Sequence, residues 1–272
     1  MAGTTMRMGV AGSAGRMGQM LIREIGATEG AVLGAATERP GHPDLGKDAS
    51  ERAGASVSGV KIDPDSAVLF TACDAVLDFT NPETTMAHAA LAAQARVVHV
   101  IGTTGLSAQQ EAELKRAAKH TAIVYAPNMS VGVNLLMALV QRVAGILGPD
   151  YDIEIVEMHH RHKVDAPSGT ALGLGRAAAA GRGVALDSVA ARGRDGHTGP
   201  RRRGDIGFAV LRGGDVVGDH SVVFAGAAER IELTHRAAGR ELYARGAVRA
   251  ALWARDKGPG FYSMADVLGL GS

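Results

Sequence analysis

Titratable side chains are concentrated in one short stretch of the chain. His159, His160, Arg161, His162 and Lys163 follow one another at the end of a predicted strand. Folding stability does not call for such a concentration, so we expect a binding or catalytic role. A protonated lysine or histidine in this stretch could donate a proton to an imine nitrogen while a hydride arrives at carbon.

A helix is predicted to begin shortly after this stretch. Ser168 has the residue type of an N-cap, and Gly169 and Thr170 would present backbone N–H groups to a carboxylate. His160 and Lys163 would add charge-assisted hydrogen bonds of roughly 1.5–3 kcal/mol each. The segment therefore predicts a pocket for an anionic substrate.

A metal site is the competing interpretation, because histidine is the commonest metal ligand in proteins. The stretch lacks the H-E-x-x-H spacing of zinc enzymes, and Arg161 and Lys163 would repel a divalent cation. We therefore expect no metal here, and we expect His162 to be an ordinary surface or core side chain.

A second stretch predicts a nucleotide site. Gly12, Gly15 and Gly18 lie between the first predicted strand and the first predicted helix. Glycines at such a turn let a pyrophosphate approach the backbone, and the start of the helix offers free N–H groups. The spacing is one residue longer than the common fingerprint, but its position after the first strand favours dinucleotide binding.

Residues after later strands would complete the cofactor site. Glu38 follows the second strand at the distance expected for an acid that binds the adenosine ribose, which favours NAD. Arg39 beside it could instead pair with a 2′-phosphate, which favours NADP, so both cofactors stay open. Gly102-Thr103-Thr104-Gly105 and Ala126-Pro127-Asn128-Met129 follow two further strands and would lie near the nicotinamide end.

The elements that must position these residues form two patterns. In the first half, predicted strands at 8–11, 31–36, 75–79, 97–101 and 123–125 alternate with helices at 17–26, 84–94 and 108–119, around a looser insertion at 41–60. Since parallel strands need crossover connections, this alternation predicts an α/β fold with a Rossmann-type parallel sheet.

The second half lacks this alternation. A helix is expected at 131–147, a strand at 151–158, a helix at 171–180, strands at 206–211, 216–224 and 230–235, and a last helix at 240–255. Gly213-Gly214 would join the first two of the three consecutive strands as a hairpin. We expect a smaller α/β domain with a mixed or antiparallel sheet.

Composition excludes several classes of protein. The chain has 272 residues and a formal net charge of +1, which argues against a general nucleic-acid or membrane-surface binder. Cys73 is the only cysteine, so no intramolecular disulfide forms. The apolar stretch 131–148 is short for a membrane span and is interrupted by Gln141 and Arg142. We expect a soluble, cytoplasmic protein, with Arg201-Arg202-Arg203 in a solvated loop.

The stretch from Glu157 to Ala171 resembles the signature of the dihydrodipicolinate reductase family, H-H-x-x-K-x-D-x-P-S-G-T-A. The likeness extends over nearly the whole chain and includes the glycine loop and the two later loops. It also includes the segments 204–224, 229–236 and 246–253.

The resemblance implies NAD(P)H-dependent reduction of 4-hydroxy-tetrahydrodipicolinate, a cyclic dicarboxylate, to tetrahydrodipicolinate in lysine and diaminopimelate biosynthesis. It implies a dinucleotide-binding domain at 1–128, completed by 240–272, and a substrate-binding domain at 129–239 that assembles a homotetramer. His159 would be the general acid/base and Lys163 the proton donor, while His160, Gly169 and Thr170 would hold the substrate. The residues that would hold NADH or NADPH are Gly12, Ser13, Ala14, Gly15, Arg16, Met17, Glu38, Arg39, Gly102, Thr103, Thr104, Ala126, Pro127, Asn128 and Met129.

Two other classes share the predicted first domain. Another nicotinamide enzyme, such as an amino-acid dehydrogenase, would act on open-chain substrates. A non-enzymatic NAD sensor would bind the dinucleotide without turning it over. Oxidation of NADH with the cyclic substrate distinguishes all three.

Overall fold

The computed structural model describes residues 5–270, which divide into two compact units. Unit 1 comprises the described residues of Met1–Val131 and of Arg240–Ser272, and unit 2 is Gly132–Gly239. The chain thus leaves unit 1, builds unit 2 and returns.

Unit 1 is built on a parallel sheet of seven strands in the order β12-β6-β5-β4-β1-β2-β3. Every pairing in it is parallel, so the carboxyl ends of its strands share one edge. The strands are β1 (Met6–Ala11), β2 (Ala31–Thr37), β3 (Ile62–Asp63), β4 (Ala75–Asp78), β5 (Val98–Ile101), β6 (Ala122–Tyr125) and β12 (Gly260–Tyr262).

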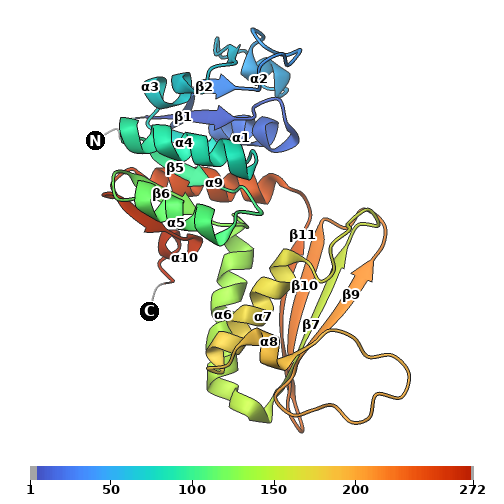
Figure 1. Ribbon diagram of the computed structural model, residues 1–272. Coiled ribbons are helices and arrows are strands. Elements are labelled where there is room, and N and C mark those ends of the chain that lie inside the picture. Colours follow the sequence, from blue (N-terminus) through green and yellow to red (C-terminus); the bar gives the residue numbers. More distant parts are fainter. Residues whose placement is uncertain (1–4, 271–272) are drawn as a thin grey trace. The chain divides into compact units, whose positions relative to one another are not determined.

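Helices cover both faces of this sheet, with α9 on the opposite side from α4 and α5 (Figure 1). Apolar residues of α1 and α9 form one core with the sheet, and those of α3, α4 and α5 form two smaller clusters on the other face. The helices are α1 (Arg16–Ala27), α2 (Ala49–Arg52), α3 (Ala67–Ala72), α4 (Pro82–Ala95), α5 (Ala108–Ala117), α9 (Glu241–Ala254) and α10 (Met264–Val267).

Unit 2 holds a mixed sheet of five strands in the order β11-β10-β7-β9-β8. On β7 every second residue is buried, because α6 and α7 cover one face of the sheet (Figure 1). Its elements are α6 (Val131–Leu147), the 3₁₀ turn η1 (Gly148–Asp150), β7 (Asp152–His159), α7 (Gly169–Gly181), α8 (Leu186–Val189), β8 (Ala190–Ala191), β9 (Ile206–Arg212), β10 (Gly218–Ala225) and β11 (Arg230–Ala237).

Helix α6 packs as the core helix of unit 2. It buries Leu136, Val140 and Ala144 against the sheet and α7, and exposes Gln141 and Arg142. Val131–Asp150 is the described stretch that is long and apolar enough to cross a membrane by length and composition, with a mean hydropathy of 1.6. A core helix passes the same test, so this composition is weak evidence for a span.

The structure confirms the expected fold class and the type of the long elements, corrects one expectation and adds several short elements. The hairpin at Gly213-Gly214 is wrong: β7 lies between β9 and β10, so these strands are not neighbours. The strand β3 and the helix α3 follow the segment 41–60 and were not expected. The strand β12 was also missed, because three residues are too few to show periodicity.

Candidate active site

The glycine loop of unit 1 turns sharply between β1 and α1. Gly12 has a φ of +68°, and the Gly15 N–H donates to the Gly12 carbonyl at 3.1 Å. A Cβ on Gly18 would lie 2.2 Å from the Gly12 oxygen, so only glycine lets the helix pack this closely on the loop. Arg16 and Met17 open α1, whose N-cap Gly15 has no side-chain cap. This is the geometry that exposes helix N–H groups to a phosphate.

A cavity of about 460 Å³ lies beside this loop and is lined by Gly12, Gly15, Glu38, Arg39 and several residues after β3 and β4. Glu38 links the glycine loop to the segment after β2. Its carboxylate accepts hydrogen bonds from the Ala14 N–H at 3.2 Å and from the Arg39 N–H at 3.0 Å.

Ser13 belongs to the glycine loop, and its buried Oγ has no hydrogen-bond partner among the described residues. The open helix start, the glycine cradle, the carboxylate and this orphaned hydroxyl all suit a dinucleotide.

The two later loops of the predicted cofactor site follow β5 and β6 at the same sheet edge. Thr103 is buried and Thr104 is exposed, while a Cβ on Gly102 would lie 2.1 Å from the Phe79 ring. In the second loop, Ala126 and Met129 are buried, and Pro127 and Asn128 reach the surface. Neither loop lines the 460 Å³ cavity.

In unit 2, a buried carboxylate orients the histidine with which β7 ends. Glu157 and His159 are two residues apart and share the covered face of the strand. The His159 Nδ1 lies 2.5 Å from the Glu157 Oε2, and Glu157 is 1% exposed. Because a carboxylate only accepts hydrogen bonds, the ring proton sits on Nδ1 and the Nε2 lone pair is free.

Glu157 is held by two further groups. Arg212 on β9 donates to both carboxylate oxygens at 2.9 and 3.0 Å, and the Ser168 N–H donates to Oε1 at 3.0 Å. Burial alone would raise the pKa of Glu157, but the hydrogen bonds from Arg212 and His159 outweigh it and hold the pKa below its usual value. Glu157 therefore stays ionised and keeps the imidazole in one orientation.

The surroundings of His159 favour its neutral form. Burial lowers its pKa against the pull of Glu157, and the charge of Lys163 lowers the pKa further. A second ring, that of His220, lies 5.0 Å away, and burial lowers its pKa to about 4. The His220 Nε2 meets the Ser168 Oγ at 3.2 Å.

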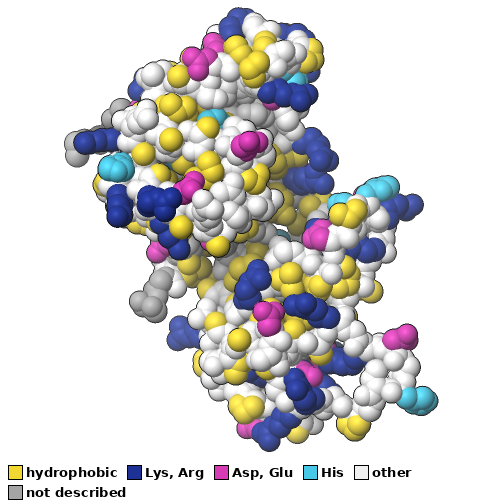
Figure 2. All heavy atoms as spheres, in the orientation of Figure 1, with side chains coloured by type: hydrophobic (Ala, Val, Ile, Leu, Met, Phe, Trp, Pro, Cys, Tyr) yellow, Lys and Arg dark blue, Asp and Glu magenta, His cyan; other side chains and the backbone are white. Residues whose placement is uncertain are grey.

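Lys163 lies in the loop after β7, half-buried, with its ammonium 2.8 Å from the Asp165 carboxylate. The Lys163 N–H donates to the His160 carbonyl at 3.1 Å, so a tight turn brings this cation back toward the end of β7. Figure 2 shows histidine and basic side chains gathered at this end of the unit. A neutral imidazole with a free lone pair and a nearby ammonium are the partners that acid–base chemistry needs.

The start of α7 has the geometry expected of a carboxylate site. Ser168 caps the helix, with its Oγ accepting from the Ala171 N–H at 3.2 Å. Gly169 is exposed, and a Cβ there would meet nothing within 4 Å. Thr170, next to it, is half-buried. Space for a ligand is therefore present beside these backbone groups.

Sequence reasoning missed four members of this site: Glu157, Ser168 beyond its capping role, Arg212 and His220. The two-residue spacing of Glu157 and His159 on one strand face could have revealed the first. Arg212 and His220 come from β9 and β10, and no sequence pattern announces that both strands flank β7.

The arginines before β9 also differ from expectation. Arg201 is not solvated: it donates to Glu154 at 2.8 Å and to Asp152 at 2.6 Å. Arg202 and Arg203 are exposed, as expected. Arg201 therefore ties the long loop before β9 to β7.

Family models match both halves of the chain. The model described as dihydrodipicolinate reductase, N-terminus, matches residues 6–129, and the model described as dihydrodipicolinate reductase, C-terminus, matches residues 132–268.

Similar proteins are named as dipicolinate-type reductases. The 4-hydroxy-tetrahydrodipicolinate reductase of Rhizobium rhizogenes is 59% identical over 271 residues, covering 99% of both chains. That of Brucella abortus is 59% identical over 266 residues, covering 97% of this chain and 99% of the relative. A dipicolinate-bound dihydrodipicolinate reductase from a Paenisporosarcina species shares the fold, with a TM-score of 0.77 and 24% identity over 97% of this chain and 99% of the other. The chain belongs to the dihydrodipicolinate reductase family.

Proposed function

We propose that the protein reduces 4-hydroxy-tetrahydrodipicolinate to tetrahydrodipicolinate with NADH or NADPH, in lysine and diaminopimelate biosynthesis. The ring exchanges a C–OH bond for a C–H bond: the carbon gains a hydride with its electron pair, and the oxygen leaves as water with one added proton. One dinucleotide is oxidised by two electrons. The relatives that match this chain along nearly its full length are named for this reaction.

The observation that carries the proposal is the arrangement at the end of β7. The buried Glu157 holds the His159 ring at 2.5 Å, and Lys163 on the following turn is a half-buried cation. This pair can supply and accept protons beside a ligand. An apolar binding module would not need a buried carboxylate, an imidazole and an ammonium at the end of one strand.

Lys163 is the proposed proton donor and His159 the general acid/base. The ammonium carries the proton that the reduction consumes, while the free Nε2 of His159 can take up or return a proton at the ring. Glu157 and Arg212 keep that nitrogen oriented and do not touch the substrate.

The proposed substrate contacts are His160, Gly169 and Thr170. A carboxylate of the ring would accept hydrogen bonds from the backbone N–H groups at the start of α7, where the helix dipole favours negative charge. His160 lies in the loop that leads there, with its N–H bonded to the Val216 carbonyl at 2.7 Å.

The proposed cofactor site is the glycine-loop cavity of unit 1. When bound, the dinucleotide supplies the hydride. The residues from Gly12 to Met17 would hold its pyrophosphate, Glu38 and Arg39 its adenosine ribose, and the loops Gly102–Thr104 and Ala126–Met129 its nicotinamide half. Glu38 suits the ribose hydroxyls of NADH and Arg39 the 2′-phosphate of NADPH, so we propose that both are accepted.

Unit 1 is thus the proposed dinucleotide-binding domain, and unit 2 the proposed substrate-binding and oligomerisation domain. The sheet face of unit 2 opposite α6 and α7 carries the partly exposed Val156, Met158 and Val223, with Leu211 49% exposed. We propose that the protein is cytoplasmic and that it assembles as a homotetramer through this sheet; the apolar side chains on the open face support association there.

The test mixes the purified protein with NADH and with the cyclic compound formed from pyruvate and aspartate semialdehyde, and it measures NADH oxidation by absorbance. Oxidation that depends on this product supports the proposal. Oxidation with open-chain keto acids alone, or NADH binding without turnover, contradicts it.

Lys163→Ala tests the proton donor. We expect kcat to fall roughly 10²- to 10⁴-fold, because a positioned acid is lost, while NADH binding persists. The matched control is Arg161→Ala, which removes a neighbouring exposed cation and should leave kcat unchanged. A near-normal kcat in Lys163→Ala refutes the role.

Glu38→Gln tests the ribose contact. Loss of the charge should raise KM for NADH more than KM for NADPH, because the adenosine ribose has a free 2′-hydroxyl in NADH and a 2′-phosphate in NADPH. Glu29→Gln, at an exposed position before β2, is the control. Equal changes for both cofactors would count against Glu38.

A further inference from the structure

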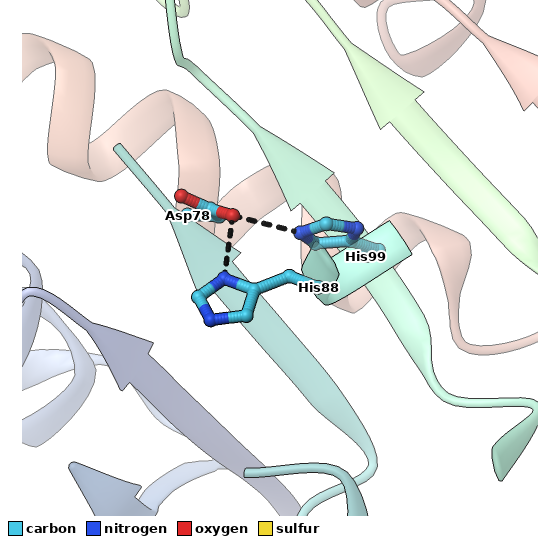
Figure 3. A group of neighbouring side chains, drawn as sticks. All are labelled: Asp78, His88 and His99. Atoms are coloured by element: carbon cyan, nitrogen blue, oxygen red, sulfur yellow. Dashed lines mark hydrogen bonds and ion pairs between the residues drawn. The ribbon is translucent and has the colours of Figure 1, made fainter. Parts of the chain in front are cut away.

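A buried polar cluster lies at the carboxyl end of β4, behind the glycine-loop cavity. Asp78 ends β4, His88 comes from α4 and His99 from β5, and all three point toward one another (Figure 3). They are 0, 2 and 0% exposed. The His88 Nδ1 lies 2.9 Å and the His99 Nε2 3.2 Å from the same Asp78 oxygen, Oδ2.

The other oxygen of Asp78 faces the loop after β4. Oδ1 accepts hydrogen bonds from the Thr80 N–H at 3.0 Å and the Thr80 hydroxyl at 2.6 Å. The Thr103 hydroxyl lies 3.5 Å from Oδ1 and 2.8 Å from the Thr85 hydroxyl. One carboxylate therefore holds two histidines on one side and the loops after β4 and β5 on the other.

The cluster reaches the wall of the cavity. Thr80, His88 and Ser66 line it together with Gly12, and the His88 Nε2 is 2.9 Å from the Ser66 hydroxyl. A Cβ on Gly12 would lie 3.3 Å from the Thr80 methyl group, so Thr80 packs directly against the glycine loop. A shift of the Asp78 carboxylate would move the surface against which that loop rests.

The ionised state of Asp78 is maintained by its hydrogen bonds and by its charge interactions with the two histidines. Burial would raise the pKa of Asp78, but the hydrogen bonds from His88 and His99 outweigh it and lower the pKa. Burial also lowers the pKa of His99. A fully buried carboxylate costs several kcal/mol to desolvate, so an apolar residue would serve the core of the sheet better. A role in positioning the loop accounts for it.

A metal ion is the alternative, since the three side chains could each offer one ligand atom within 4.8 Å of the others. The His88 Nδ1 and the His99 Nε2 already contact the Asp78 Oδ2 directly. The other ring nitrogen of His88, Nε2, has the Ser66 hydroxyl as its partner. The His99 Nδ1 has no partner. If Nε2 bound a metal, Nδ1 would bury an unpaired N–H; if Nε2–H donates to Asp78, Nδ1 buries only a lone pair. Hydrogen bonding is the cheaper arrangement.

We propose that Asp78, His88 and His99 are positioning residues for dinucleotide binding, which hold Thr80 and Thr103 in place beside the glycine loop. This inference rests on the proposed cofactor site of unit 1. It assigns no proton transfer and no contact with the reacting atoms to the three residues.

The experiment measures the Kd of NADH by its fluorescence, without substrate, for paired variants at each histidine. His88→Leu and His99→Leu remove the hydrogen bond to Asp78. His88→Asn and His99→Gln keep an amide N–H where Nδ1 and Nε2 were. We expect the leucine variants to raise the Kd of NADH about tenfold, because each loses one charge-assisted hydrogen bond to Asp78. The amide variants should retain most of the wild-type affinity for NADH.

Asp78→Asn should raise Kd at least as much, and in turnover the change should fall on KM for NADH more than on KM for the cyclic substrate or on kcat. His120→Leu, at an exposed position of unit 1, is the control for removing a histidine. Unchanged Kd values in folded leucine variants overturn the inference, as does an equal loss in leucine and amide variants.

A metal analysis of the purified wild-type protein completes the test. Metal-free protein that binds NADH, unaffected by chelator, supports positioning by hydrogen bonds. One bound transition metal per chain, with loss of NADH affinity on chelation, overturns it. Because NADH binding is measured without substrate, protein that binds NADH but does not reduce the cyclic substrate refutes the proposed function and leaves the Kd comparison decisive for Asp78.

Discussion

Each unit buries one carboxylate with histidine at the end of a strand, and the two sites differ in what lies beyond the ring. In unit 2, Glu157 is balanced by Arg212, and the free Nε2 of His159 faces Gly218, 3.0 Å from where a Cβ would stand. In unit 1, the donors to Asp78 are two histidines and threonine, with no arginine among the described residues, and His88 ends on the Ser66 hydroxyl.

The difference teaches that the carboxylate–histidine pair does not define a role. A ring whose second nitrogen is open can exchange protons with a ligand, and an arginine that keeps its carboxylate charged supports that function. A ring whose second nitrogen is bonded or enclosed can only fix its surroundings. The same two residue types thus give a proposed acid/base in unit 2 and a proposed support for a loop in unit 1.

The largest expected effect comes from removing the charge of the buried carboxylate in unit 2. In Glu157→Gln the amide cannot keep His159 in one tautomer, so we expect kcat to fall roughly 10²- to 10⁴-fold. The Kd of NADH should not change. Steady-state kinetics and NADH fluorescence measure both.

Glu154→Gln is the matched control for this change. Glu154 lies on the same strand and also pairs with arginines, Arg194 and Arg201, but on the opposite face. Its kcat should stay normal. If both variants lose activity equally, the effect comes from the strand and not from the orientation of His159.

A smaller effect should follow from crowding the free nitrogen. In Gly218→Ala the new methyl group would stand 3.0 Å from the His159 Nε2, so the ring must shift, and we expect kcat to fall about tenfold. Gly213→Ala is the control, because its methyl would meet only the flexible end of Met158 at 3.1 Å. An unchanged kcat in Gly218→Ala would mean that the His159 Nε2 does not take part in proton transfer.

The smallest effect concerns stability in acid. Burial lowers the pKa of His220 to about 4 from an ordinary value of 6.5, so the unfolded chain takes up the proton first. The contribution of the neutral His220 ring to the free energy of unfolding is therefore fully present above pH 6.5. It is lost as the pH falls toward 4, at up to about 1.4 kcal/mol per pH unit. His220→Gln keeps a partner for Ser168 and should make the urea midpoint less sensitive to pH between 7 and 5.

The exposed His197→Gln serves as the comparison and should keep the wild-type pH dependence. An identical slope in wild type and His220→Gln would show that the ring does not contribute.

Sequence patterns predicted the features that depend on residues close together in the chain. The alternation of strands and helices indicated the parallel sheet of unit 1, and the Ser168 N-cap was correctly placed. The histidine–lysine stretch lies where expected because its members are neighbours in the chain. The order of the strands in unit 2 was not predictable, since Gly213-Gly214 has the composition of a hairpin while β7 pairs with both flanking strands.

Partners contributed by distant strands were missed for the same reason. Arg212 and His220 resemble ordinary polar residues of an alternating strand, and only the pairing of β7 with β9 and β10 brings them to Glu157 and Ser168. Asp78, His88 and His99 lie in runs that are otherwise apolar, and nothing in such runs says which buried side chains meet.

The return of the chain to unit 1 has a consequence for synthesis on the ribosome. The core of unit 1 includes Ala244, Ala247 and Ala251 of α9, and β12 supplies the last strand of its sheet. Every residue of unit 2 has been polymerised before the first residue of α9. The nascent chain can therefore complete its second unit while the first still lacks a helix and an edge strand, an inversion of the usual N-terminal-first order.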